Sequence, residues 1–514
     1  MKINIVGGGP AGLYFALLMK KVDPAHEITV WERDPADNTY GWGIVLSERT
    51  LDSLRGADFE TYLELVKHAQ SWNRVDVVHK GETVSVGGND FSGIKRIHWL
   101  NLLQERGRRL GVNLRFEANV NTLDQVSDCD LLVGADGLKS MVREARRDAF
   151  LTKTEERHNQ YIWYGTPKPF RGLTMIFRPH ADGLYVAHAY TFEPGMSTFI
   201  VECDPGTWSR AGFQGMSEAE TATYLADVFR PELQDRPLLS NRSVWNRFLL
   251  VRNVHWYSEN VVLLGDALHS VHFSIGSGTK LAVEDAIALA GSFTQGASVP
   301  EALKAFEKSR KPRVDAFQDA AMDSLLWLEN VRPDIGLDPL PFTFRLMRRS
   351  NRVTYRRLKD QDPDFVERYE AWRWDHEGPI HQEFLDLFEK KAYAHLATLL
   401  PDGRPHVTSV YADYDGRHVL INSAKGRQKD LNMERRRFVA LEITDPDKPD
   451  RYLGVQGEVV EITEDGADEH LDRLAKRYLE RDRYPPTWRY PGEIRRIYKI
   501  KPHKVIHWDP FGGW

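Results

Sequence analysis

Three glycines near the start of the chain, Gly7, Gly9 and Gly12, have the G-x-G-x-x-G spacing of a phosphate-binding turn. They follow the apolar run 2–6 and open a helical apolar pattern. A turn without side chains lets the backbone approach a pyrophosphate, whose charge the start of the helix stabilises. Glu32 ends the next predicted strand, 20 residues after Gly12, where its carboxylate can accept hydrogen bonds from a ribose. The spacing therefore predicts a dinucleotide site.

Two later motifs combine glycine with aspartate. The run 130–143 begins with a buried-strand pattern and continues as Gly-Ala-Asp-Gly, with Asp136 as its second acidic residue. Residues 265–269 read Gly-Asp-Ala-Leu-His after another apolar run, and Gly276 and Gly278 follow just before a predicted helix. The start of that helix can stabilise negative charge on a bound group.

These three blocks, in this order, resemble the single-component FAD-dependent aromatic monooxygenases. The resemblance covers residues 1 to about 374. Within it, the segment 272–282 is most similar to the hydroxylases of salicylyl-CoA and 2-aminobenzoyl-CoA, with the tryptophan-intermediate hydroxylase of violacein synthesis as a relative. Two positions depart from the wider class, because Phe273 replaces a frequent proline and Lys280 a frequent asparagine.

The resemblance implies bound FAD, reduction by NADH or NADPH, and transfer of oxygen from O₂ to an electron-rich ring through a flavin C4a-hydroperoxide. It assigns the FAD ribityl chain to Asp266, gives Asp136 contacts with both FAD and NAD(P)H, and places Arg96 near the FAD. The expected cofactor-binding residues of this part are Gly7, Gly9, Gly12, Glu32, Arg33, Arg96, Asp136, Asp266, Gly276, Gly278 and Thr279.

Candidate catalytic residues lie on a predicted strand and beside residues 273–278, which lead into the predicted helix and are called the flavin loop here. The period of two in strand 184–192 places His188 and Tyr190 on one face. If that face looks toward the flavin, these side chains could orient the substrate or take its proton, and His272 lies beside the loop. A structural histidine is the alternative reading of both imidazoles.

An arginine-rich segment over 345–357 resembles the CoA-thioester hydroxylases. Guanidinium groups are suited to phosphates, so the segment could cradle CoA. The alternative is a solvated helix face. The expected substrate-binding residues are Arg345, Arg348, Arg349 and Arg352.

Residues 386–514 resemble the split-barrel flavoproteins of the pyridoxamine-phosphate-oxidase type. Lys425, Arg427 and Lys429 form a cationic strand-to-helix segment that could hold the phosphate of FMN or of a deazaflavin, the alternative being a solvated basic turn. Such barrels bind flavin between two subunits, which implies a homodimer. The barrel could reduce the product, supply electrons to the FAD, or only dimerise the chain.

The strand and helix patterns place these residues in an α/β fold. The sequence predicts a Rossmann-like FAD-binding domain with an inserted antiparallel substrate sheet, followed by a linker and a C-terminal β split-barrel. The monooxygenase region spans 1–374, with FAD-binding parts at about 1–75, 95–155 and 255–330, the substrate sheet at 76–94 and 156–254, the linker at 375–385 and the barrel at 386–514.

Composition excludes several other classes of protein. The 514 residues carry a net charge of −5, which gives no support for a nucleic-acid binder. No apolar run reaches the length of about 18 residues that a membrane span needs, and no secretory signal opens the chain. Cys129 and Cys203 are expected to be reduced, buried thiols, and they are too few for a structural zinc site, so we expect no metal. A cytoplasmic protein is expected.

The expected function is therefore the NAD(P)H- and O₂-dependent hydroxylation of an aromatic acyl-CoA resembling 2-aminobenzoyl- or salicylyl-CoA. A free tryptophan- or indole-like metabolite is the alternative substrate. A non-enzymatic flavin redox sensor with a dimerisation barrel is the alternative class of protein.

Overall fold

The structure is a computed structural model that describes residues 1–39, 41–276, 278–293 and 297–510. It divides into two compact units, Met1–Arg352 and Val353–Trp514. This division falls before the boundary predicted at residue 374, so α13 (Tyr355–Gln361) and α14 (Pro363–His376) belong to the second unit.

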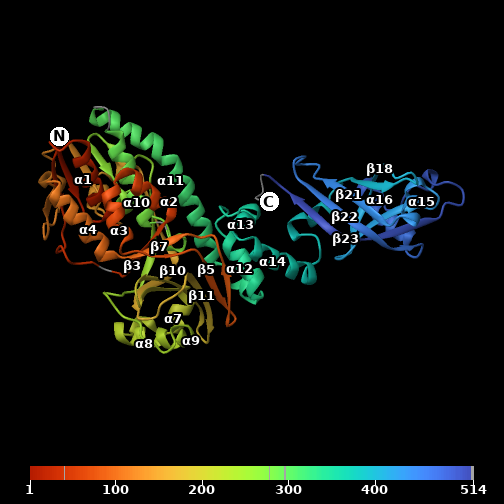
Figure 1. Ribbon diagram of the computed structural model, residues 1–514, viewed down its shortest axis with the longest axis horizontal. Helices are drawn as coiled ribbons and strands as arrows, with labels where there is room; N and C mark the ends of the chain where they lie inside the picture. The colour runs from red at the N-terminus through yellow and green to blue at the C-terminus, as the bar shows by residue number, and fades with distance from the viewer. Residues whose placement is uncertain (40, 277, 294–296, 511–514) are drawn as a thin grey trace. The chain divides into compact units, whose positions relative to one another are not determined.

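In the described part of unit 1, a parallel sheet with one antiparallel edge strand lies among the helices near the N-terminus (Figure 1). Helix α1 (Pro10–Val22) packs against both α4 (Arg96–Arg109) and α10 (Gly278–Ser292) beside this sheet. The central strands are apolar runs because both faces of the sheet are covered. The predicted Rossmann-like part is confirmed. The strand order is β15 (Tyr257–Ser258), β16 (Val261–Leu263), β9 (Leu131–Gly134), β1 (Lys2–Val6), β2 (Glu27–Trp31), β8 (Asn113–Arg115).

A second, seven-stranded sheet is the inserted substrate sheet. It is antiparallel except where β11 pairs in parallel with β5. One face carries Ile162, Tyr185 and Phe199, which form a core together with side chains of the helical segment 205–233. The opposite face carries His188 and Tyr190. The strand order is β14 (Asn246–Asn253), β10 (Thr152–Thr166), β13 (Met196–Cys203), β12 (Gly183–Glu193), β11 (Leu173–His180), β5 (Val75–His79), β6 (Glu82–Val86), and the covering helices are α7 (Pro205–Arg210), α8 (Glu218–Val228) and α9 (Arg230–Leu233).

A small three-stranded sheet, which the sequence did not predict, lies beside β12. It consists of β3 (Gly43–Ser47), β7 (Phe91–Lys95) and β4 (Gln70–Trp72). The other α-helices of unit 1 in the described residues are α2 (Glu48–Ala57), α3 (Phe59–Val66), α5 (Met141–Ala145), α6 (Arg147–Phe150), α11 (Val299–Glu329) and α12 (Pro339–Arg348).

Unit 2 contains a seven-stranded antiparallel sheet that curls around its own core, as the predicted split-barrel requires. Leu396, Leu441, Val455 and Tyr498 meet inside it. The long final strand and α16 were missing from the predicted elements. The strand order is β18 (Pro405–Val410), β17 (Ala394–Leu399), β21 (Phe438–Thr444), β22 (Tyr452–Thr463), β23 (Arg495–Trp508), β20 (Val419–Ala424), β19 (Ala412–Tyr414), accompanied by α15 (Gln428–Arg435) and α16 (Ala467–Leu479).

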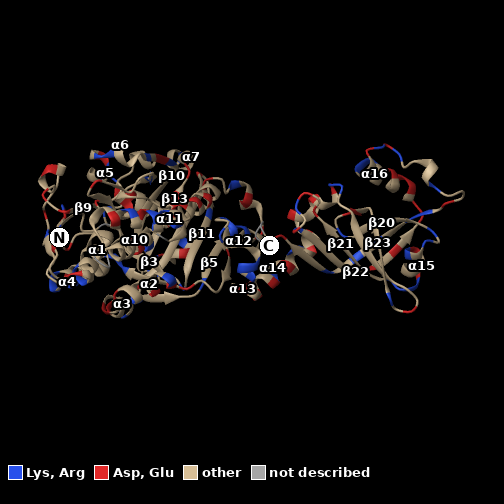
Figure 2. Cartoon of the chain, turned by 90° about the horizontal axis from the view of Figure 1, so that it is seen from above, with Lys and Arg blue, Asp and Glu red and all other residues tan. Residues whose placement is uncertain are grey.

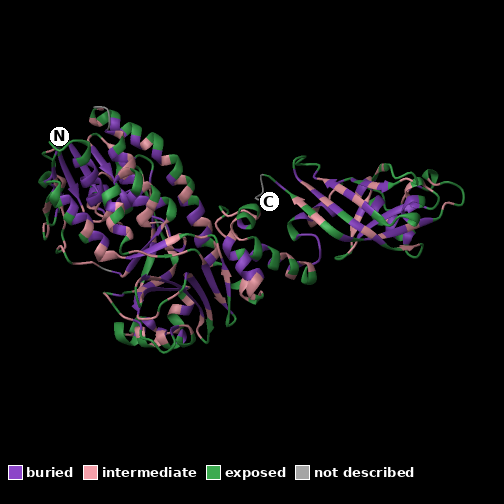
Figure 3. Ribbon diagram, viewed as in Figure 1, coloured by how far each residue is buried: buried purple, intermediate pink, exposed green. Residues whose placement is uncertain are grey.

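Buried residues fill the strands at the centre of each unit (Figure 3), and basic and acidic residues are interspersed along the chain (Figure 2). Neither cysteine forms a disulfide, and Cys203 is buried whereas Cys129 is only half-buried. None of the helices in the described residues combines the length and apolarity that would let it cross a lipid bilayer.

Gly93 in β7 marks the closest approach of the small sheet to β12, because a Cβ added there would lie 2.3 Å from the backbone oxygen of Thr191. We expect Gly93→Ala to destabilise unit 1 by about 1–3 kcal/mol, because a backbone atom cannot rotate away. The melting temperature from tryptophan fluorescence measures the effect. Gly56→Ala, in α2 with no atom within 4 Å of the added Cβ, is the control and should not lower it. Equal melting temperatures for the two variants would contradict the close approach of Gly93 to the Thr191 oxygen.

Candidate active site

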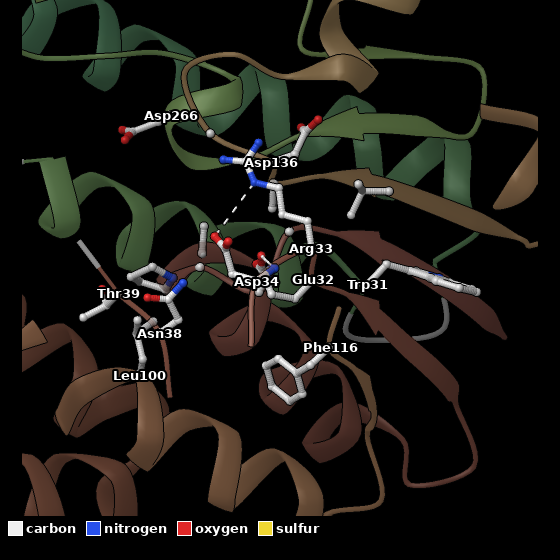
Figure 4. Close-up of a pocket in the computed structure, with 18 of the residues that line it drawn as sticks. Trp31, Glu32, Arg33, Asp34, Asn38, Thr39, Leu100, Phe116, Asp136 and Asp266 are labelled. Carbon is white, nitrogen blue, oxygen red and sulfur yellow. Dashed lines mark hydrogen bonds and ion pairs between the residues drawn. The ribbon is translucent and has the colours of Figure 1, made fainter. Parts of the chain in front are cut away.

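A pocket lies at the carboxyl ends of β1, β2 and β9, and it is lined by residues from all three sequence motifs (Figure 4). Gly12 and Gly276 are outside the lining. The predicted cofactor residues that line the pocket are Gly7, Gly9, Glu32, Arg33, Arg96, Asp136, Asp266, Gly278 and Thr279.

The glycine turn is shaped by two close backbone approaches. Gly7 has a φ of +110°, and a Cβ there would lie 2.2 Å from the Ala135 oxygen. A Cβ on Gly12 would lie 2.3 Å from the Gly7 oxygen. Gly9, in contrast, has no atom within 4 Å of its Cβ position and faces the pocket. Gly7 and Gly12 therefore serve the fold, whereas Gly9 leaves room for a ligand.

Glu32 stands beside this turn and is partly used by the protein itself. Its Oε2 accepts a hydrogen bond from the Gly8 amide at 2.7 Å, and its Oε1 accepts one from the Asp34 amide at 2.9 Å. Each carboxylate oxygen has a second lone pair for a ribose hydroxyl. Arg33 also lines the pocket, with its Nε 3.9 Å from an Asp34 oxygen (Figure 4).

Asp136 shapes the opposite wall. Its carboxylate accepts hydrogen bonds from the Ser140 hydroxyl and from the amides of Met141 and Val142, at 2.5, 2.6 and 3.2 Å, and so caps the start of α5. The buried Arg143 then donates to the Ala267 oxygen at 2.9 Å, which ties this wall to the Gly-Asp motif. Arg143 belongs to the motif that the sequence singled out, but its bridging role has no signal in the sequence.

Asp266, in the turn 265–267, lines the pocket (Figure 4), and its exposed carboxylate has no hydrogen-bond partner among the described residues. The same turn is held from behind by a buried ionic chain. The His269 Nε2 lies 2.7 Å from an Asp285 oxygen, and the Arg310 Nε donates to the other oxygen at 2.8 Å. Burial favours the neutral Asp285 carboxyl, but His269 and Arg310 outweigh it and hold its pKa below the ordinary value.

Helix α10 begins at Gly278, and Gly278 and Thr279 line the pocket. Ser277, within the predicted glycine loop, lies outside the described residues. Arg96 begins α4, and its Nε donates to the Thr39 hydroxyl at 3.1 Å on the pocket rim. Arg242 also lines the pocket but had no signal in the sequence, since it lies between elements and outside any motif.

The three predicted catalytic side chains are all buried. The His188 ring meets the Phe273 ring edge-on at 5.3 Å, and Phe273 lies in the segment that joins Asp266 to Gly278. His272 precedes it, and its Nδ1 accepts a hydrogen bond from the Ser274 amide at 3.4 Å. The Tyr190 hydroxyl donates to the Gly43 oxygen at 2.7 Å, and burial raises its pKa. The structure therefore brings the sheet face and the flavin loop together.

The four arginines differ in their surroundings. The Arg345 guanidinium pairs with Asp334 at 2.6 Å, and Arg348 lies over the Phe344 ring. Arg349 donates to the Ser274 and Leu346 oxygens and to the Ser324 hydroxyl, at 2.8, 2.7 and 2.9 Å. Arg352 lies over the Phe317 ring at 4.4 Å, where Lys280 also stacks at 4.9 Å. Arg349 is thus committed to the protein interior, and Arg352 is exposed.

In unit 2, Lys425 and Arg427 lie between β20 and α15, and Lys429 lies in the first turn of α15. The Lys425 Nζ lies 3.4 Å from a Glu464 oxygen, and Arg427 lies 3.6 Å from Glu493. Lys429 is more enclosed, and burial lowers its pKa, with the neighbouring Arg427 adding to the effect.

The pocket of unit 1 fits a flavin dinucleotide. An open glycine turn faces it at Gly9, and the partnerless Asp266 carboxylate offers an acceptor to the hydroxyls of a ribityl chain. Arg33, Lys139 and Arg242 supply positive charge at its rim for a pyrophosphate.

Comparison with known proteins agrees with this fit. The family model of the FAD binding domain matches residues 1–321, and that of pyridoxamine 5'-phosphate oxidase matches 380–509. The chain is 39% identical to a salicyloyl-CoA 5-hydroxylase of a Streptomyces species, over 75% of this chain and 76% of that protein. It is 36% identical to the 3-hydroxy-4-methyl-anthranilyl-[aryl-carrier protein] 5-monooxygenase of Streptosporangium sibiricum, over 66% of this chain and 92% of that protein.

A solved structure of 2-methyl-3-hydroxypyridine-5-carboxylic acid oxygenase shares the fold of unit 1. It superposes with a TM-score of 0.56 at 18% identity and covers 68% of this chain and 95% of that one. The resemblance inferred from the sequence is confirmed, and so is the expected dependence on FAD. The chain therefore belongs to the FAD-dependent aromatic monooxygenases and carries a domain of the pyridoxamine 5'-phosphate oxidase family over residues 380–509.

Proposed function

We propose that this monooxygenase hydroxylates an electron-rich aromatic ring carried as a thioester of coenzyme A, such as 2-aminobenzoyl- or salicylyl-CoA. The observation that carries the proposal is the segment from Asp266 to Gly278, which lines the FAD pocket at both ends and packs Phe273 against His188 in its middle. FAD, when bound, takes electrons from NADH or NADPH and activates O₂. The name of the salicyloyl-CoA 5-hydroxylase relative supports the substrate class.

His188 is the residue that we assign to the proton of the ring substituent, because its imidazole is buried beside the loop. Tyr190 has the narrower role of holding the start of β3, because its hydroxyl already donates a hydrogen bond to the Gly43 oxygen. His272 orients the loop through Ser274. The buried sheet face that carries His188 and Tyr190 also keeps water away from the reacting oxygen.

The phosphates of CoA would meet the exposed Arg352 at the end of unit 1 and the neighbouring Lys280, which is half-buried and pairs with Glu284 at 2.7 Å. Arg352 and Lys280 both lie over Phe317, and burial lowers the pKa of Lys280. Arg348 and Arg345 follow along the same segment, each near the surface. Arg349 is omitted from this proposed phosphate site because its donors are satisfied inside the protein.

Unit 2 is proposed to bind a second flavin at Lys425, Arg427 and Lys429 and to reduce the hydroxylated product. It is also proposed to dimerise the chain. The face of its sheet opposite the core exposes apolar side chains on several strands, and a second copy of the same face would cover them. These exposed residues include Val407, Phe438, Ile506 and Trp508.

The pocket predicts a specific loss in Asp266→Ala. The variant should stay folded but purify with less than about a tenth of the parent's FAD, because an acceptor facing the ribityl chain disappears. Flavin absorbance per chain measures this loss. Asp128→Ala changes a carboxylate on the surface of the same unit and should retain full FAD. A fully yellow Asp266→Ala protein would show that this carboxylate does not hold the cofactor.

The substrate class is tested with a panel of aromatic CoA thioesters, the matching free acids, and tryptophan or indole derivatives. We expect NAD(P)H and O₂ consumption to depend on a thioester. Arg352→Gln should raise KM for the thioester about tenfold, equivalent to ~1.4 kcal/mol, with kcat unchanged. Arg313→Gln, an exposed arginine of α11, is the control. Turnover of a free indole compound alone would replace the CoA proposal with the alternative substrate.

Replacing Arg427 and Lys429 together with glutamine should remove the flavin of unit 2 and leave FAD bound in unit 1, since these cations belong to the proposed phosphate site. The variant should still hydroxylate and should accumulate a more oxidised, aromatic product, measured by mass spectrometry. Arg436→Gln, at the far end of α15, is the control. If the product and its yield per NAD(P)H match those of the parent, the barrel has no reductase role.

A further inference from the structure

A buried carboxylate that no sequence signal marked as functional lies between the two predicted catalytic histidines. Glu202 in β13 is 1% exposed, and His188 and His272 are each 4% exposed. The His188 Nε2 lies 3.1 Å from the Oε1 of Glu202, and the His272 Nε2 lies 3.7 Å from its Oε2. One carboxylate therefore faces two imidazoles, one from the sheet and one from the flavin loop.

The surroundings fix how the two imidazoles are protonated. The Nδ1 of His272 faces the Ser274 amide, so it must carry a lone pair, and the ring proton is on Nε2, toward Glu202. The Nε2 of His188 also faces a Glu202 oxygen. Because an ionised carboxylate accepts hydrogen bonds and cannot donate them, the ring proton of His188 is on Nε2. His188 therefore keeps its Nδ1 as the acceptor.

The charge of Glu202 is maintained despite its burial. Burial favours the neutral carboxyl, but the hydrogen bond from His188 and the electrostatic attraction of His188, His272 and the Arg349 guanidinium together hold its pKa below the ordinary value. Arg157, from β10, also contributes to the potential at His272. An ionised carboxylate in such a site lowers stability relative to a well-packed apolar side chain, so stability alone does not account for it.

We propose that Glu202 is a positioning residue for hydroxylation, which holds His188 with its Nδ1 free to accept the proton of the ring substituent and holds the flavin loop through His272. The inference rests on the proposed function. In the step, the O–H or N–H bond of the substituent breaks, an N–H bond forms at the His188 Nδ1, and the electron pair stays on the substituent. Glu202 then stabilises the resulting imidazolium, as a carboxylate does in other His–carboxylate pairs.

The kinetic test uses the FAD-loaded full chain with the panel compound that is turned over best. Glu202→Gln should lower kcat about 30- to 100-fold with little change in KM. Because the carboxylate favours the protonated imidazole, its loss should also move the acidic limb of the kcat profile to lower pH. Glu202→Asp should recover part of the rate. Glu156→Gln, an exposed glutamate on the same sheet, is the control. An unchanged kcat and pH profile in Glu202→Gln would overturn the proposal.

A second measurement needs no substrate. In ¹⁵N-histidine-labelled chain, with signals assigned through His188→Gln and His272→Gln, both rings should carry their proton on Nε2. Glu202→Gln should change this tautomer in at least one ring, while FAD content and melting temperature stay near those of the parent. Unchanged tautomers would overturn the proposal even if an activity is found. If no panel compound is turned over but the tautomers change, the proposed substrate fails and the positioning by Glu202 stands.

Discussion

The turn after β1, where a Cβ at Gly12 would already overlap the Gly7 oxygen, packs so closely on the turn after β9 that Gly7 has no room for a side chain either. This contact aligns the carboxyl ends of the two strands, and the pocket forms where they end. The other walls are then added to this frame: Arg143 joins the second motif to the Gly-Asp turn, and His269 and Asp285 hold that turn from behind. The cofactor residues can therefore come from positions 7 to 279 and still face one space.

Much of the frame could be predicted from local sequence. The bounds of β1 and β2 follow from short apolar runs ended by a glycine turn and by charged residues, and the face shared by His188 and Tyr190 follows from the period of two. These signals lie within a few residues of one another. The short strand patterns over residues 393–462 likewise predicted most strands of the split-barrel in unit 2.

What could not be predicted depends on residues far apart in the chain. Glu202 is 14 residues from His188 and 70 from His272, and only the pairing of β12 with β13 and the path of the loop bring the three together. Arg349 looked like one more member of a basic segment, and its hydrogen bond to the Ser274 oxygen depends on how α12 and α11 meet the loop. Charge in a sequence shows that a group can bind an anion, but not which oxygen it will face.

The anchoring of the flavin loop by Arg349 has a consequence for where this chain can be divided. The match to the FAD binding domain ends at residue 321, yet the guanidinium that holds the Ser274 oxygen comes from beyond it. A hydroxylase cut at that point would lose Ser324 and Arg349 together, and the Ser274 carbonyl would be left without its donor. A piece that retains this anchor therefore extends at least to Arg349, close to the end of unit 1 at Arg352.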